Sequence, residues 1–124
     1  MYNVRTAWGK AKKQVYNGYR YDSGFEAKYA MELDIRVKAK DIVKYDRQVN
    51  LDLIVNDYRV CQYRIDFIVY HNNGDIEYVE TKGWPSPEWK LKWKLFEALF
   101  CDIPGNILTV VQQGNFKMRK IKKV

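Results

Sequence analysis

The chain has 124 residues, of which 47% are hydrophobic and 30% charged, and this balance predicts one domain with its own core over residues 1–124. No apolar run approaches the ~20 residues of a membrane span and nothing resembles a signal peptide, so we expect a cytoplasmic protein with no membrane partner. His71 is the only histidine, and Cys61 and Cys101 form neither a metal spacing nor a disulfide framework. These counts exclude a multi-histidine zinc site and favour a reduced compartment.

The net charge of +7 gathers at the two ends of the chain. Residues 1–20 and residues 117–124 each carry five cations and no acid, so the middle of the chain is net negative. Basic ends suit a polyanionic partner gripped at its edges, or they simply keep the chain in solution. We define a basic N-terminal arm (1–20) and a basic C-terminal tail (113–124). The candidate DNA contacts in the arm are Lys10, Lys12 and Lys13.

A helix is predicted after the arm, from Gly24 to about Lys40, with Ser23 as its N-cap. Glu26 follows the cap by three residues, which is the spacing of a capping box. Glu26 also lies in line with the apolar face of the helix, so its carboxylate is placed at the end of the face that packs on a sheet. The residues of that face are Ala30, Leu33 and Val37.

Three strands are predicted next, because the hydrophobic period changes to two. The first is a long strand from Ile42 to Val55, followed by an Asn56-Asp57 turn. The second runs from Arg59 to Tyr70, and a hairpin loop over 71–75 leads to the third, from Ile76 to Lys82.

A second helix is predicted from Glu88 to Phe100, with Leu91, Leu95, Ala98 and Leu99 facing inward, and a short strand from Ile107 to Val111. The order is helix, antiparallel strands, helix, strand. It predicts an α/β fold with a central mixed sheet flanked by helices.

Two acids meet in this arrangement if the hairpin is centred on Asn73. Asp66 then pairs with Glu80 on one face, with Cβ atoms about 5 Å apart, and Lys82 lies one step further along. A two-residue Asn73-Gly74 turn would instead send Asp66 to the other face.

Facing carboxylates repel each other, and partial burial increases the repulsion. A shared proton, a neighbouring lysine or a divalent cation could offset it. Oxygen ligands without histidine or cysteine favour Mg²⁺, with Mn²⁺ as a substitute. Beside such a cation, Lys82 could stabilise charge on a pentavalent phosphorus or help to deprotonate water, and Glu26 could hold a second metal.

These residues resemble the PD-(D/E)XK nuclease core, in which an aspartate, here Asp66, is followed after thirteen intervening residues by Glu80-Thr81-Lys82. The segments "SGFE" (23–26), "YRIDF" (63–67) and "VETKG" (79–83) are similar to those of phage endonuclease I type Holliday-junction resolvases, over roughly residues 20–112. The residue before the aspartate is Ile65 where the family usually has proline.

The resemblance implies a restriction-endonuclease-like fold and a Mg²⁺-dependent, homodimeric endonuclease that cuts four-way DNA junctions, encoded by a phage and acting in the host cytoplasm. Glu26, Asp66 and Glu80 would bind metal, Thr81 would add its backbone carbonyl, and Lys82 would be the catalytic lysine. No small-molecule cofactor is implied.

Other functions remain open at this stage. The chain could be a mobile-element or phage DNA-processing nuclease without junction preference, a non-catalytic DNA-binding module of the same fold, or a small RNA-binding protein. Gln48 could contact DNA or orient a metal-bound water, or it could be a solvated strand residue. Lys90 and Lys94 could contact phosphates or form a solvated helix face.

Overall fold

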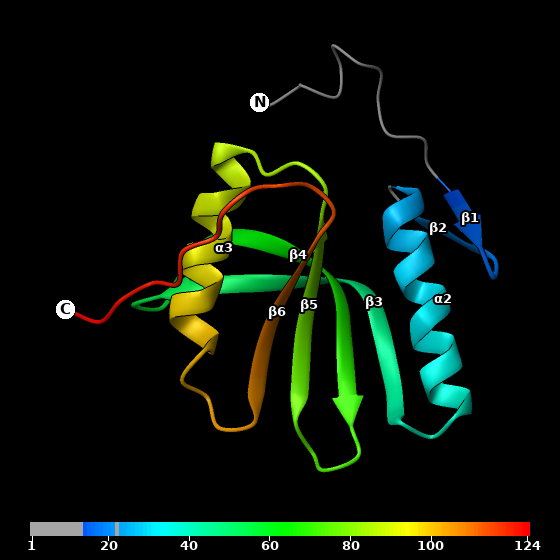
Figure 1. Cartoon of the computed structure of the whole chain (residues 1–124). Coiled ribbons are helices and arrows are strands. Elements are labelled where there is room, and N and C mark those ends of the chain that lie inside the picture. The colour runs from blue at the N-terminus through cyan, green and yellow to red at the C-terminus, as the bar shows by residue number, and fades with distance from the viewer. Residues whose placement is uncertain (1–13, 22) are drawn as a thin grey trace.

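The computed structural model describes residues 14–21 and 23–124 (Figure 1). Its main sheet has the strand order β3-β4-β5-β6, in which β5 and β6 are parallel and the other neighbours antiparallel. The elements are β1 (Gln14–Tyr16), β2 (Tyr19–Tyr21), α2 (Gly24–Lys38), β3 (Ile42–Val55), β4 (Tyr58–His71), β5 (Ile76–Lys82), α3 (Pro87–Phe100) and β6 (Asn106–Gln112). The predicted α/β fold with a mixed sheet and two flanking helices is confirmed. No helix within the described residues is long and apolar enough to cross a membrane.

The second part of the predicted arm is a β-hairpin, in which β1 pairs with β2. Its turn is Asn17-Gly18, with φ values of 51° and 80°. Positive φ at both central residues is the geometry of the tight turn that Asn-Gly favours, so the sequence carried a hairpin signal that the arm assignment overlooked. The candidate DNA contacts Lys10, Lys12 and Lys13 lie outside the described residues.

The helices cover opposite faces of the sheet, because successive side chains of β5 belong to different core clusters. Val79 packs in the cluster beneath α2, whereas Tyr78 packs in the cluster beneath α3. The predicted cap of α2 is present, since the Ser23 hydroxyl accepts a hydrogen bond from the Glu26 amide at 3.1 Å. The helix buries Glu26, Ala27, Ala30 and Leu33.

The face of α3 that packs inward is not the predicted one. Leu91 is 70% exposed and Ala98 is also exposed, while Trp89, Trp93 and Phe96 are buried. Leu95 and Leu99 pack only at the border of the cluster. The aromatic stripe, repeating every three to four residues, faces inward because its large rings meet the rings of β4 and β5.

The long strands β3 and β4 bend sharply in the middle, as Figure 1 shows. On one side of the bend, Tyr45 and Phe67 pack toward α2, and on the other side Val49 and Ile65 pack toward α3. The pairing register is the same on both sides, so the change of face comes from the bend itself. Gln48 lies at this point with a left-handed φ of 52°.

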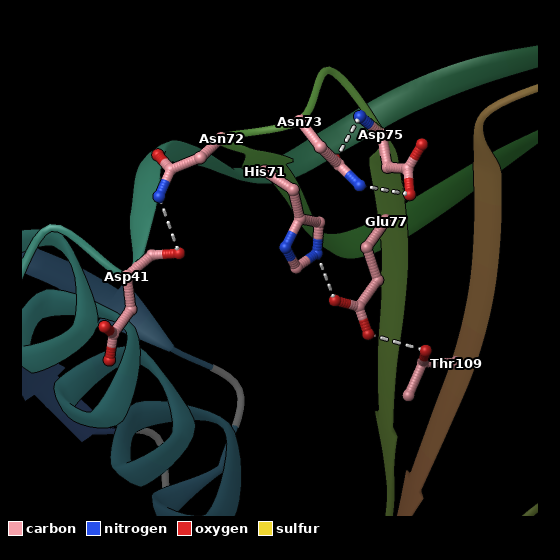
Figure 2. Close-up of polar contacts among 7 residues, drawn as sticks. All are labelled: Asp41, His71, Asn72, Asn73, Asp75, Glu77 and Thr109. Atoms are coloured by element: carbon pink, nitrogen blue, oxygen red, sulfur yellow. Dashed lines mark hydrogen bonds and ion pairs between the residues drawn. The ribbon is translucent and has the colours of Figure 1, made fainter.

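The hairpin between β4 and β5 has the predicted register. Phe67 pairs with Val79 and Tyr70 with Ile76, so the loop is centred on Asn73. Figure 2 shows side chains of this loop holding its shape: the Asn73 amide donates to Asp75, and the Asn72 amide donates to the Asp41 carbonyl.

A polar cluster lies beside this loop (Figure 2). His71 Nε2 lies 2.8 Å from Glu77 Oε1, and the Thr109 hydroxyl donates to Glu77 Oε2 at 2.7 Å. These bonds link β4, β5 and β6 at the loop end of the sheet, three residues before Glu80 on β5.

Candidate active site

Glu80 is one of two acids of the site that are almost fully enclosed. It is 4% exposed and lies near the end of β5. The Tyr63 hydroxyl donates to Glu80 Oε1 at 2.9 Å, and Lys82 Nζ lies 3.4 Å from Glu80 Oε2. The Trp89 indole in turn donates to the Tyr63 hydroxyl at 3.2 Å. The carboxylate is therefore fixed from both β4 and α3.

Asp66 lies at the bend of β4 and reaches the strand that carries Glu80. Its Oδ2 accepts a hydrogen bond from the Thr81 amide at 2.8 Å and one from the Thr81 hydroxyl at 2.7 Å. The regular ladder of β4 and β5 ends one pair earlier, at Phe67 and Val79. The predicted Asp66–Glu80 pair therefore lies just beyond the ladder, and Asp66 hydrogen-bonds to Thr81, the residue that follows Glu80.

The electrostatics of Glu80 reflect this neighbourhood. Burial, the largest effect, and the negative charge of Asp66 raise the pKa of Glu80 to about 8, while Lys82 and the Tyr63 hydrogen bond act to lower it. The ionised form is thus disfavoured near neutral pH unless another positive charge is present. The same burial and the Glu80 charge raise the pKa of Tyr63, which keeps its hydroxyl protonated as a donor.

Lys82 is held between the acid and an aromatic ring. Its side chain is 17% exposed, and Nζ lies 4.7 Å from the centre of the Trp89 ring. Cation–π attraction and the contact with Glu80 therefore position the ammonium group at the site.

Glu26 reaches the sheet from the first turn of α2 and is 3% exposed. Gln48 Nε2 donates to Glu26 Oε2 at 3.3 Å and to the Arg20 carbonyl at 3.2 Å. Gln48 is therefore a bridge between α2, β3 and β2, and not the solvated strand residue considered above.

Tyr63 and Trp89 are site residues that the sequence analysis missed. The alternation of side chains along β4 predicts that Tyr63 is a core residue. A buried hydroxyl needs a hydrogen-bond partner, and this need is the only signal in the sequence that could have indicated a nearby acid. The predicted phosphate contacts Lys90 and Lys94 are exposed on α3 and contact none of these acids.

The donor set has the chemistry of a Mg²⁺ site. Mg²⁺ usually takes one or two carboxylates and completes its shell with waters, and Asp66 and Glu80 with the Thr81 carbonyl would supply such oxygens. Within residues 14–21 and 23–124, no three His, Cys, Asp or Glu side chains gather closely enough to hold a metal ion. Glu26 accepts a hydrogen bond from Gln48 and does not form a three-carboxylate metal site with Asp66 and Glu80.

An open hollow adjoins the site. It has a volume of about 810 Å³ and lies between the first turns of α2, where Ser23 and Phe25 line it, and the end of β6, where Gln112 and Gln113 line it. Gln112 pairs with Lys82 in the parallel ladder. The hollow therefore comes close to the end of β5, but none of Glu26, Asp66, Glu80 and Lys82 lines it.

The chain belongs to the family described as Protein of unknown function (DUF1064), which matches residues 7–113. Searches of curated proteins and of solved structures find no significant match.

Proposed function

We propose that this member of the family is a metal-dependent DNA endonuclease with a PD-(D/E)XK core, which hydrolyses backbone phosphodiesters. The observation that carries the proposal is that Asp66 binds Thr81 at the end of β5, directly between Glu80 and Lys82, which contact each other. Two neighbouring acids beside an amine, with one acid buried, are costly for the fold, and a pure DNA-binding surface gains nothing from acids that repel phosphate.

Each residue has a role that follows from its position. Asp66 and Glu80 would hold the metal ion, with the Thr81 carbonyl beside them. Bound Mg²⁺ supplies Lewis-acid stabilisation of the phosphate and acidifies water. Lys82, close to Glu80, would stabilise negative charge on the reacting phosphate. Glu26 and Gln48 would orient the attacking water from the side of α2.

The substrate class follows from the sequence motifs and not from the geometry of the site. The similarity to phage endonuclease I type resolvases favours four-way junctions, cut by a homodimer whose two copies each open one strand. Nucleases without junction preference would use the same set of residues, Asp66, Glu80 and Lys82. The experiment below therefore compares cutting of a junction with cutting of linear duplex.

The test uses a synthetic four-way junction and a linear duplex of matching sequence, each with Mg²⁺ or with EDTA. We expect paired, metal-dependent nicks near the branch point. Equal cutting of linear duplex would retain the nuclease but remove the junction preference. Binding without any cutting, under all metal conditions, would overturn the proposal in favour of a DNA-binding module.

A further inference from the structure

A strongly basic surface of the described chain lies beside the proposed active site and is built from two separate segments, α3 and the C-terminal segment. Figure 1 shows the C-terminal segment running along α3. Exposed cations from both segments gather there, and we call them the basic surface: Lys90, Lys94, Lys117, Arg119, Lys120 and Lys122.

The C-terminal segment is fixed on α3 by its apolar residues and by hydrogen bonds. Met118 packs against the core cluster, and the Ile121 amide donates to Glu97 Oε1 at 3.3 Å. At the start of the segment, the side-chain amide of Gln112 donates a hydrogen bond to the Phe116 carbonyl at 2.9 Å. Because Met118 and Ile121 are partly buried, the basic residues between and beside them are turned outward.

Two adjacent hollows show how closely these cations converge. Lys90, Lys94, Lys117 and Arg119 line the first, together with Met118. The second is lined by Lys94 and Arg119 again, with Lys120, Ile121 and Lys122. Among the described residues, no acid lines either hollow, and Lys94 and Arg119 are shared by the two.

Acids are sparse around this surface in the described part of the chain, where of the six cations only Lys120 shares a hollow with acids, Glu97 and Asp102. None of the six cations takes part in an ion pair there. On α3, Glu88 is engaged by Lys92 at 3.6 Å, and Glu97 is buried beneath the C-terminal segment. Six unpaired cations at close range repel one another, and a bound polyanion would relieve that repulsion.

The position of the surface links it to the site. Trp89, whose ring lies against Lys82, directly precedes Lys90 on the first turns of α3. A phosphate chain passing the end of β5 can therefore continue over α3 onto the basic surface.

We propose that the basic surface binds the phosphodiester backbone of DNA flanking the cleaved bond, with successive phosphates seated in the two hollows around Lys94 and Arg119. The proposal rests on the proposed function for the choice of DNA as the polyanion. Each phosphate neutralised by a cation releases counterions, so the logarithm of the binding constant falls with the logarithm of salt by about 0.9 per contact.

The test compares two double variants with equal loss of charge. Lys94→Gln with Arg119→Gln removes the shared cations of the hollows. Lys38→Gln with Lys40→Gln removes two exposed lysines at the far end of α2 and serves as the control. Binding of fluorescent linear duplex and of a four-way junction is measured in EDTA over a range of salt, after thermal unfolding has shown that both variants fold.

We expect the slope of log binding constant against log salt concentration to become shallower by about 2 in the first variant. The control should keep the wild-type slope. An equal loss in both variants, or no loss in the first, would overturn the proposal. The outcome is separable from catalysis. Wild-type protein that binds DNA through these residues but, with Mg²⁺, cuts neither the duplex nor the junction contradicts the proposed function alone. Cutting with an unchanged slope in the first variant contradicts the basic surface alone.

Discussion

The central residue of this protein is Glu80, a carboxylate that the fold buries next to another acid. Its two oxygens contact Tyr63 and Lys82, yet its pKa remains raised to about 8. In the metal-free protein, the folded state therefore holds a proton that the unfolded state releases at an ordinary carboxyl pKa near 4.5. The protonation of Glu80 therefore makes the stability of the folded protein depend on pH.

We predict that metal-free protein loses stability as pH rises from about 5 to above 8. The folded state binds more protons than the unfolded state in this window, so the slope of the unfolding free energy with pH is negative. The contribution of Glu80 is complete below the unfolded pKa and is lost as pH passes the folded pKa of about 8. Denaturant unfolding is measured in EDTA. Across this pH range, the unfolding free energy of the wild type should fall by ~2–4 kcal/mol more than that of Glu80→Gln. Parallel curves for the two proteins would contradict the prediction.

Tyr63 is predicted to be the residue that positions Glu80. Tyr63→Phe leaves the Trp89 indole without its acceptor and removes a donor from Glu80, which should cost ~1–3 kcal/mol of stability. The pKa of Glu80 should also rise further, because the Tyr63 hydrogen bond lowers it. Tyr58→Phe, at a side chain that is 76% exposed, is the matched control and should be neutral. Equal stability of both variants in urea would exclude this role.

At the scale of elements, the sequence predicted what alternation and turn residues determine locally. The bounds of β3 and β5 and the register of the 71–75 loop agree with the structure, because a shift by one residue would have exposed the apolar face of the hairpin. The bend at Gln48 could not be predicted, since a left-handed glutamine leaves no signal in a hydrophobic pattern. The contact of Gln48 with Glu26 depends on that bend.

The inward face of α3 shows a second limit of sequence reasoning. Both the leucine stripe through Leu91 and the aromatic stripe through Phe96 have helical spacing, so periodicity alone does not choose between them. The choice depends on Tyr63 and Tyr78, which lie far away in sequence and meet Phe96 in space.

We therefore predict a large difference between truncations on the two stripes. Phe96→Ala should lower the free energy of unfolding by ~3–5 kcal/mol, because Phe96 is fully buried. Leu91→Ala should change it by less than ~0.5 kcal/mol, because Leu91 is 70% exposed. Phe96→Leu, which leaves a smaller cavity, provides a measurable intermediate if the alanine variant does not fold. Similar losses at both positions in urea denaturation would mean that the helix packs differently.

At the scale of the whole molecule, charge is divided by sign. The acids Glu26 and Glu80 are buried where helix and sheet meet, whereas cations cover α3 and the C-terminal segment. The proposed nuclease would therefore use different residues for attraction to a polyanion and for chemistry on it. Removing an acid of the site should leave the attraction in place.

Asp66→Asn is predicted to abolish cutting and leave DNA affinity unchanged or slightly tighter. The substitution keeps the size of the side chain and an oxygen that can accept from the Thr81 amide, but it removes the negative charge that a metal ion needs. Losing a negative charge cannot weaken binding to phosphate. Lys82→Ala should also stop cutting. Its affinity for DNA should fall by no more than the loss of one phosphate contact would cause.

Asp57→Asn is the matched control for this experiment, because it removes the same charge at an exposed turn residue outside the site. It should cut the four-way junction at the wild-type rate. Rates are compared at saturating protein, and affinities are measured in EDTA, so that the two quantities are independent. If Asp66→Asn cut as fast as Asp57→Asn, Asp66 would have no part in hydrolysis. Its hydrogen bonds with Thr81 would then serve only the structure of the fold.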